Sequence, residues 1–297
     1  NLIVQMGSMD NISKEYESTL YKLPNNDLKW EKTKSYNLGI DFSFFQSWLS
    51  GTLEIYKKVG EDQVIQKTLA PSTGANYVAI NDGDVNNSGW ELSVNVNPIH
   101  GKDWNWGISF NTAKNYNKVK NAGEELSVTW SDYVNGTLVR NGRSINSFYA
   151  YRFKGLNDEG LPTFYGESEK DEDGVAIITT QEEAFDAAFV YAGRREPTLS
   201  GGFSTNVRFK RLTMNANFSF ALGNKIRLNN LYYESGQALP FPQQNMSSEF
   251  VDRWREPGDD TVIPALSDDA MTFGPYDRKY PIANNRWDMY NKSDIRV

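Results

Sequence analysis

Between positions 36 and 44 the chain reads Tyr36-Asn37-Leu38-Gly39-Ile40-Asp41-Phe42-Ser43-Phe44. The even positions are large and apolar, whereas the odd positions are Asn, Gly, Asp and Ser. Because side chains on a β-strand point alternately to its two sides, this strict period of two gives the strand one apolar side and one polar side. The stretch therefore predicts a β-strand that separates an apolar environment from water.

The same alternation recurs in five further stretches, at 48–56, 90–96, 104–110, 199–209 and 212–222. Short turns join the strands in pairs, at 46–47, 97–103 and 210–211. The opposite ends open into long polar stretches, from 58 to 86 and from about 112 onward, which we expect to be loops. Bacterial outer-membrane barrels show this asymmetry, with short periplasmic turns and long extracellular loops.

Aromatic residues make up 13% of the chain and gather at the ends of the predicted strands. Those near the short turns are Phe44, Phe45, Trp48, Trp104 and Phe209, and those at the far ends are Tyr36 and Trp90. Two belts of this kind mark the two surfaces of a membrane. We therefore predict an all-β fold, an antiparallel transmembrane β-barrel segment with long extracellular loops.

A soluble β-sandwich or propeller is the alternative, since its strands also alternate. The length of the strands, their Asn-, Ser- and Gly-rich polar sides and their many aromatic residues favour the barrel. No run approaches the ~18 to 20 apolar residues of a membrane helix. Such a run is not expected in a barrel, where the apolar residues occupy every second position.

Composition excludes several classes of function. A net charge of -7 without a basic stripe argues against a nucleic-acid partner. The absence of cysteine excludes disulfides and thiolate chemistry within this chain. The single histidine, His100, falls in a predicted short turn, which argues against a Ser-His-Asp triad or a typical zinc site. Carboxylate pairs for glycoside hydrolysis stay open among 38 acidic residues, but no spacing marks one. We predict that the protein is not an enzyme.

Two acidic clusters, Glu169–Gly174 and Asp268–Asp269, are candidate Ca²⁺ ligands. The first lacks the full spacing of a calcium hand, so a solvated turn is the favoured interpretation. We predict no cofactor, with Ca²⁺ in these loops as the alternative.

The long loops carry aromatic residues beside amides and acids. An aromatic ring takes up the apolar C–H surface of a sugar or a peptide side chain while its polar neighbours bind hydroxyls or amides. The candidate substrate-binding residues are Trp130, Tyr133, Tyr232, Tyr233 and Trp254. The alternative is that these rings pack the loops over the barrel. Packing is favoured for Tyr149 and Tyr151, which we expect in a strand.

One helix is predicted within a loop. Thr180 and Glu183 form a capping box, the apolar residues that follow have helical spacing up to Phe189, and Gly193 is the expected stop. We interpret it as a small helix that packs on its own loop.

Several segments together resemble the SusC/RagA-type TonB-linked outer-membrane transporters. They are Asn25–Thr33 running into Tyr36–Phe42, Asn86–Leu92, Gly142–Leu156 with Gly160–Pro162, Pro197–Phe203, Phe218–Lys225 and Arg253–Asp259. The first is similar to the family segment Asn-Pro-x-Leu-Lys-Trp-Glu, with Asn26 at the position of the proline. Each motif alone is modest, but their order across nearly the whole chain is specific.

The resemblance implies that residues 1–297 are part of a 22-stranded barrel domain whose N-terminal plug and final strands are absent. Such transporters import oligosaccharides or peptides with energy relayed by the TonB–ExbB–ExbD system, and a SusD-like surface lipoprotein covers their extracellular loops. We therefore expect nutrient import across the outer membrane of a Gram-negative cell. The partners would be that lipoprotein, the rest of the barrel and the TonB system, which binds the missing N-terminal part.

Two alternatives remain beside import of oligosaccharides or peptides. One is a soluble β-rich protein that binds or cleaves glycans. The other is a barrel that takes up a siderophore or cobalamin, which the family motifs argue against. The sequence does not decide between glycan and peptide, because aromatic and acidic loops suit both.

Overall fold

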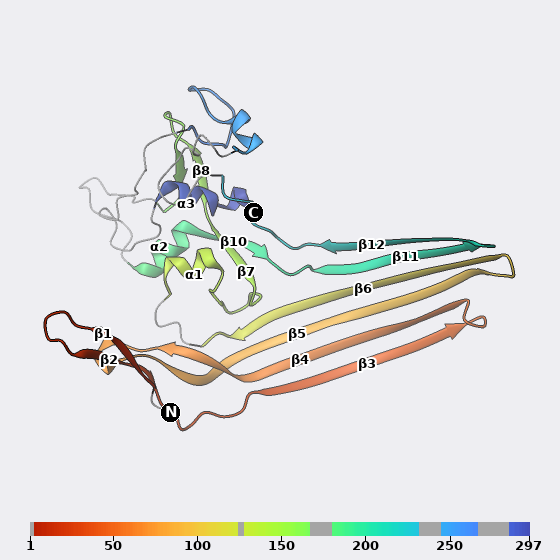
Figure 1. The fold of residues 1–297 in the computed structure, drawn as a ribbon, viewed down its shortest axis with the longest axis horizontal. Helices are drawn as coiled ribbons and strands as arrows, with labels where there is room; N and C mark the ends of the chain where they lie inside the picture. The colour runs from red at the N-terminus through yellow and green to blue at the C-terminus, as the bar shows by residue number, and fades with distance from the viewer. Residues whose placement is uncertain (1–2, 124–127, 167–179, 232–244, 267–284) are drawn as a thin grey trace. The chain divides into compact units, whose positions relative to one another are not determined.

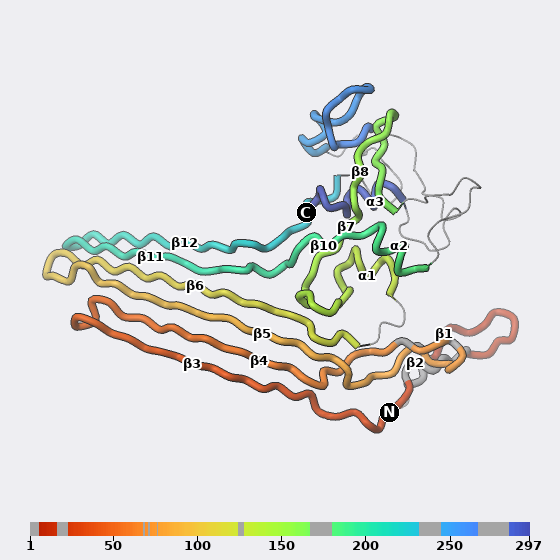
Figure 2. The backbone as a smooth tube through the Cα atoms, turned by 180° about the vertical axis from the view of Figure 1, so that it is seen from behind, coloured from red at the N-terminus to blue at the C-terminus, as the bar shows by residue number. Residues whose placement is uncertain are grey.

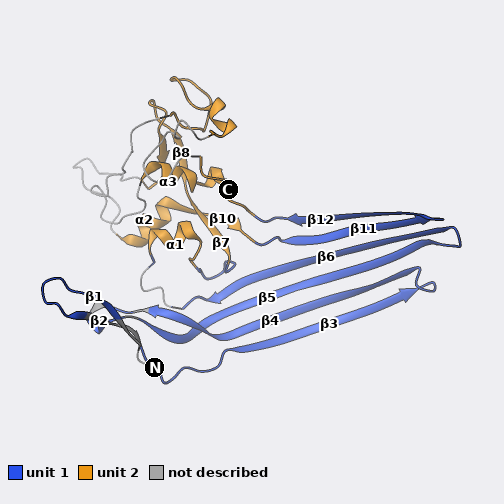
Figure 3. Cartoon of the chain, viewed as in Figure 1, with its two compact units in different colours: residues 1–128, 139–145, 196–224 blue, residues 129–138, 146–195, 225–297 orange. Residues whose placement is uncertain are grey.

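The computed structural model describes residues 3–123, 128–166, 180–231, 245–266 and 285–297. The chain divides into two compact units (Figure 3). Unit 1 comprises Asn1–Val128, Val139–Ile145 and Glu196–Asn224. Unit 2 comprises Thr129–Leu138, Asn146–Arg195 and Lys225–Val297.

Unit 1 is an eight-stranded sheet dominated by long antiparallel strands that lie side by side (Figure 1). The antiparallel strands, in spatial order, are β3 (Lys32–Phe44), β4 (Leu49–Thr68), β5 (Ala75–His100), β6 (Trp104–Asn121), β11 (Leu199–Phe209) and β12 (Leu212–Leu222). A hairpin of β1 (Ile3–Met9) and β2 (Tyr16–Leu23) joins the start of β5 through a parallel pairing. The predicted strands and their three short turns are confirmed.

The register places like residues in rows across the sheet. One such row consists of Leu38, Ile55, Trp90, Lys114, Leu199 and Leu222. The neighbouring row, on the opposite side, consists of Gly39, Glu54, Glu91, Ala113, Ser200 and Ala221. We call the two sides of the sheet that contain these rows the apolar face and the polar face. The alternation along each strand thus builds one continuous apolar surface and one continuous polar surface.

The turn between β3 and β4 has an unusual backbone. Phe45, Gln46 and Ser47 all have positive φ angles, of 53°, 56° and 68°. The Trp48 amide donates to the Phe45 carbonyl oxygen at 3.1 Å and closes the turn. Left-handed backbone is unfavourable for non-glycine residues, so this tight hairpin stores strain.

The prediction of a loop from 58 to 86 is wrong. β4 continues to Thr68 and β5 begins at Ala75, with a 3-10 turn (η1, Pro71–Thr73) between them. Figure 2 shows these two strands continuing past the start of β3 at Lys32 toward β1 and β2. Likewise β6 continues to Asn121, beyond the expected loop start near Thr112. In these extensions polar residues fall on both faces and apolar residues such as Val64 and Ile65 are adjacent, so the strands continue after the period of two has ended.

A strap formed by residues 25–31 is tied to this β4–β5 extension. The Asn81 amide group donates to the carbonyl oxygens of Lys29 (3.0 Å) and Asp62 (2.7 Å), and accepts from the Lys29 amide (2.8 Å). The Glu31 carboxylate accepts from the Val64 amide at 2.9 Å. These bonds cross-link three segments where the sheet has a bulge, since Asp62 is left-handed with φ 57°.

Unit 2 contains short elements around an aromatic core. They are α1 (Trp130–Asn135), β7 (Ser147–Tyr151), β8 (Phe153–Leu156), β9 (Pro162–Phe164), α2 (Gln181–Ala188), β10 (Phe189–Arg194), η2 (Ser248–Asp252), α3 (Arg286–Asn291) and η4 (Asp294–Arg296). β7 pairs with β10 and β8 pairs with β9. The expectation that Tyr149 and Tyr151 lie in a strand is confirmed, and both rings are buried.

The predicted helix is α2, and its capping box is confirmed. The Thr180 hydroxyl accepts from the Glu183 amide at 3.2 Å, and the Glu183 carboxylate accepts from the Thr180 amide at 3.1 Å. The predicted stop at Gly193 is wrong, because Phe189 already starts β10. Among the described residues, no helix is both long enough and apolar enough to cross a membrane.

Candidate functional site

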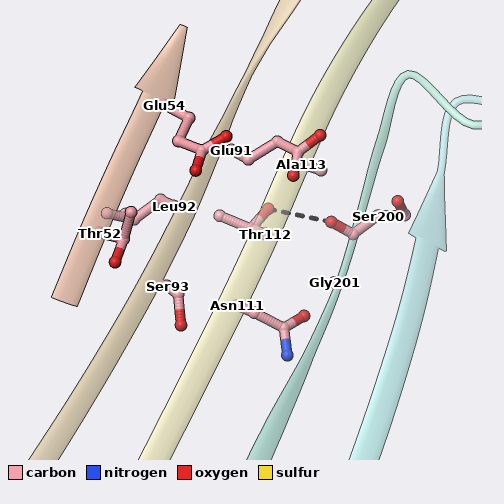
Figure 4. A pocket seen from close by; sticks show the side chains of 10 residues that line it. All are labelled: Thr52, Glu54, Glu91, Leu92, Ser93, Asn111, Thr112, Ala113, Ser200 and Gly201. Carbon is pink, nitrogen blue, oxygen red and sulfur yellow. Dashed lines mark hydrogen bonds between the residues drawn. The ribbon is translucent and has the colours of Figure 1, made fainter. Parts of the chain in front are cut away.

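The polar face of unit 1 is hollowed where β4, β5, β6 and β11 run side by side (Figure 4). The hollow has a volume of about 460 Å³. It is lined by Thr52, Glu54, Glu91, Leu92, Ser93, Asn111, Thr112, Ala113, Ser200 and Gly201. Most of these residues belong to the polar face, and small side chains such as Ser93 and Ala113 leave the space above the sheet open.

A second hollow of about 440 Å³ adjoins the first. Its lining residues are Ser35, Tyr36, Asn37, Glu54, Tyr56, Lys58, Asn87, Glu91 and Asn115. Glu54 and Glu91 line both hollows. These two carboxylates are therefore central to the surface that a solute on the polar face would meet.

Glu54 and Glu91 are direct partners in the antiparallel register. Figure 4 shows them projecting from neighbouring strands on the same side of the sheet. Their outer neighbours in the row, Gly39 and Ala113, carry no charge. Like charges that face each other across two strands are unfavourable for stability. Within the described residues neither carboxylate forms an ion pair, so both remain available to a ligand.

Hydrogen bonds between side chains connect the rest of the polar face. Thr52 donates to the Asp41 carboxylate at 2.7 Å, and Ser109 donates to the Asn95 amide oxygen at 2.7 Å. Such bonds between strands fix the orientation of the amides and hydroxyls. The glutamate pair thus stands out on the polar face as two adjacent like charges without an ion-pair partner among the described residues.

No metal site is formed by the side chains that the structure describes. They contain no group of three or more acidic, histidine or cysteine residues placed to hold an ion. A carboxylate pair alone provides fewer ligands than Ca²⁺ takes from a protein. The chemistry that the pair offers is charge attraction and hydrogen-bond acceptance.

The candidate residues Trp130 and Tyr133 lie on α1 in unit 2. Trp130 is half-buried. Tyr133 is only 2% exposed, and its ring stacks on Phe189 with 4.3 Å between the ring centroids. It also packs against Tyr149 and Phe185. In this structure Tyr133 therefore offers no free ring face to a ligand, because its neighbours already cover it.

Asp132 explains why α1 forms. Its carboxylate accepts from the amide and hydroxyl of Thr129 (2.9 and 2.7 Å) and from the Thr137 hydroxyl (2.9 Å). Burial of the carboxylate by itself raises the pKa of Asp132, but these hydrogen bonds outweigh it, and the pKa lies below its ordinary value. The carboxylate joins both ends of the helix, which stabilises a helix of only six residues.

Trp254 is half-buried against the turn between β8 and β9. A Cβ atom built on Gly160 would lie 2.3 Å from Cε3 of the Trp254 ring. The Trp254 amide donates to the Ile263 carbonyl oxygen and the Ala265 amide to the Gly160 carbonyl oxygen, each at 2.9 Å. The glycine therefore permits a close ring-on-backbone contact that fixes one face of the indole.

The remaining predicted residues, Tyr232 and Tyr233, lie outside the described residues, as do the acidic clusters Glu169–Gly174 and Asp268–Asp269. The residues that the structure does bring together, Glu54 and Glu91, were not among the predicted site residues. A signal for them exists in the sequence, since each is an acid at a polar position of an alternating strand, where Asn, Ser and Gly are the rule.

Comparison with known proteins agrees with this geometry. Residues 11–161 match the family model described as TonB dependent receptor-like, beta-barrel. TonB-dependent receptor P3 of Formosa agariphila is 28% identical over 254 residues, which are 81% of this chain and 25% of that protein. TonB-dependent receptor SusC of Bacteroides thetaiotaomicron is 26% identical over 232 residues, 73% of this chain and 21% of that protein.

Among solved structures, a RagAB peptide transporter structure has a TM-score of 0.68 and 24% identity. The match covers 91% of this chain and 29% of that one. Likeness at this identity shows a shared fold. The chain spans only about a quarter of the length of the curated relatives it matches.

The chain belongs to the family of TonB-dependent receptor-like β-barrels. The predicted resemblance to SusC and RagA is confirmed, as is the predicted fold class of a β-barrel segment. The described strands form an open sheet with β3 and β12 at edges. This segment therefore has the strand pairing of a barrel but does not close into one by itself.

Proposed function

We propose that this chain forms a section of an outer-membrane barrel that imports oligosaccharides or peptides in a TonB-dependent manner. The observation that carries the proposal is the register of the sheet, which sorts apolar and polar residues onto opposite faces over six strands. Lipid would contact the apolar face, and the polar face would line the aqueous lumen.

The dimensions of the sheet support a membrane location. β11 has 11 residues. At a rise of roughly 3.4 Å per residue the strand is about 34 Å long, and at a tilt of about 40° it covers about 26 Å of depth. The outward apolar band of outer-membrane barrels is about 25 Å tall. Many residues of the apolar face are exposed in this chain, among them Leu38 at 66% and Phe218 at 62%.

The residues of the polar face favour binding of a solute that carries hydrogen-bond donors or positive charge. Glu54 and Glu91 lie together on this surface without an ion-pair partner among the described residues. Peptides supply ammonium and guanidinium groups, which bind carboxylates strongly. Sugars supply neutral hydroxyl donors, which bind them more weakly. Within the proposed pair of substrate classes, the wall therefore favours peptides with cationic groups.

The proposed function also includes partner proteins and ligand-binding residues in the loops. The name TonB-dependent receptor, carried by the relative SusC, supports use of the TonB system, and the SusC/RagA resemblance implies a SusD-like surface lipoprotein as the partner. Trp130, Tyr232, Tyr233 and Trp254 stay proposed ligand-binding residues of the loops, whereas Tyr133 is left out of the proposal because its ring is already covered. Residues 1–297 as a whole are a proposed part of the barrel domain. Ca²⁺ in the acidic loops stays an alternative to the proposed absence of a cofactor.

The proposal is tested by uptake in cells that express the intact protein, with and without a functional TonB system. We expect a labelled cationic peptide or an oligosaccharide to be retained only when TonB is functional. The protein should stay with the membrane after a carbonate wash. Recovery in the wash without detergent, or uptake independent of TonB, would overturn the proposal.

A further inference from the structure

Several lysines occupy apolar-face positions at the end of the apolar band that is farther from the three short turns, which we call the loop end. The apolar face has three consecutive rows here, which the register defines strand by strand. They are Leu38–Ile55–Trp90–Lys114, then Tyr36–Lys57–Ser88–Tyr116, then Lys34–Val59–Asn86–Lys118. Every row contains at least one lysine, on the face whose other residues are mostly apolar or aromatic.

The opposite face carries charges of both signs near this level. The polar-face row next to Lys114 contains Glu54 and Glu91, and Lys58 lies on the polar face beside Lys57. If the lysines served only solubility, they would be expected on the face that meets water. Lys114 lies instead in the row of Leu38, Ile55 and Trp90, where a charged group is unfavourable unless its ammonium reaches a polar partner. Lys57 lies in the next row of the same face, beside Tyr36.

The described residues do not supply acidic partners for the central lysines. Lys34 is paired with Glu61 at 2.7 Å, and Lys32 with Asp62 at 2.8 Å. Lys57, Lys114 and Lys118 have no ion pair with any described carboxylate. The Lys114 ammonium lies 5.1 Å from the ring centroid of Tyr116. Amphipathic aromatic rings such as that of Tyr116 are enriched at membrane–water boundaries.

We propose that Lys57, Lys114 and Lys118 bind the phosphate groups of negatively charged lipid headgroups in the leaflet at the loop end of the barrel. The alkyl stems lie along the apolar face and the ammonium groups extend to the level of the headgroups. Tyr36, Trp90 and Tyr116 occupy the same boundary. This lipid-binding surface depends on the membrane location given in the proposed function, but not on the identity of the transported substrate.

The test is native mass spectrometry of the intact protein in mild detergent, titrated with phosphatidylglycerol or with zwitterionic phosphatidylcholine. The variant Lys57→Gln with Lys114→Gln removes two charges from the apolar face. The matched control, Lys58→Gln with Arg208→Gln, removes two charges from the polar face, since both residues occupy polar-face positions. Because Arg208 lies near the short-turn end, the single changes Lys57→Gln and Lys58→Gln are compared as well. These two residues are adjacent, so that comparison isolates the side of the sheet.

We expect phosphatidylglycerol affinity to fall roughly fivefold for each lysine removed, while phosphatidylcholine affinity and the control stay unchanged. Lys57→Arg with Lys114→Arg should keep the affinity, which separates charge from folding defects. Equal phosphatidylglycerol affinity in the parent and the Gln variant would overturn the proposal, as would an equal loss in the control. A parent that binds this lipid selectively but imports neither peptide nor glycan would refute the transport function and leave the lipid surface intact.

Discussion

Glu54 on β4 and Glu91 on β5 face each other directly in the antiparallel ladder, with the uncharged Gly39 and Ala113 on either side. The pair is shared by two adjoining hollows of the polar face. A like-charge pair opposes folding by itself, so its position on a surface rich in neutral amides and hydroxyls points to a role in binding.

Replacing both acids by Gln therefore separates stability from binding. Because the repulsion disappears, we expect the double variant Glu54→Gln with Glu91→Gln to be as stable as the parent or more stable by about 0.2–1 kcal/mol. Uptake of a cationic peptide should fall, while uptake of a neutral oligosaccharide should change little. Thermal unfolding in detergent and paired uptake assays measure the two effects. Unchanged uptake of the cationic peptide would exclude the pair from the solute path.

The strap of residues 25–31 depends on Asn81. The change Asn81→Ala removes three hydrogen bonds that connect Lys29 and Asp62, and we expect a loss of about 1–3 kcal/mol in local stability. Hydrogen exchange at the Lys29 amide should accelerate accordingly. The control is Asn86→Ala, on the apolar-face side of the same strand. Equal protection of Lys29 in both variants would show that the strap is held by other contacts.

Gly160 permits the close contact with Trp254. Its φ of 74° already disfavours a side chain, and an added Cβ would collide with the indole. We expect Gly160→Ala to displace the ring, with a cost of about 2–3 kcal/mol in local stability and a red shift in Trp254 emission. Gly142→Ala is the matched control, because Gly142 has a φ of 81° and open space around its Cβ position. Identical effects of the two changes would assign the cost to backbone strain alone.

The ion pair between Glu249 and Arg296 makes unit 2 sensitive to acid. The hydrogen bond from Arg296 holds the pKa of Glu249 below its ordinary value of 4.5. Since the folded pKa is the lower one, the stabilisation is complete above the ordinary value and is lost as pH falls through the folded pKa. Glu249 is 42% exposed, so Glu249→Gln should cost only about 1 kcal/mol at neutral pH.

The pH dependence itself is the readout for this pair. Hydrogen exchange in η2 and η4 should become faster below the ordinary carboxyl pKa in the parent, relative to Glu249→Gln, which lacks the titrating group. Glu256→Gln serves as the control, since Glu256 is exposed. Parallel pH profiles in the parent and Glu249→Gln would contradict the assignment.

The alternating strands could be predicted from the sequence because one face of each strand is apolar, as in Tyr36–Phe44. The extensions of β4 and β5 could not be predicted, since polar residues such as Lys57, Lys58 and Asn86 fall on both faces of the strands. The period of two therefore no longer appears there. The strand pairing here depends on backbone hydrogen bonds and on side chains such as Asn81, which are far apart in the sequence.

The helices show the same limit. The capping box at Thr180 predicted the start of α2, but its end was set by the pairing of Phe189 with Tyr151, a tertiary effect. α1 has a capping box at Thr129 and Asp132 that the sequence displays, but its six residues are too few to be recognised by periodicity. The parallel contact of β2 with β5 had no local signal at all.

In the proposed function, one face of this sheet contacts lipid and the other contacts water. The chain has no cysteine, so single cysteines along residues 36–44 of β3 can each carry one nitroxide label in the intact, membrane-embedded protein. We predict that oxygen dissolved in the lipid reaches even positions such as Leu38 and Ile40, while a water-soluble nickel chelate reaches odd positions such as Gly39 and Asp41. Equal access of the nickel chelate to even and odd positions would contradict the barrel assignment.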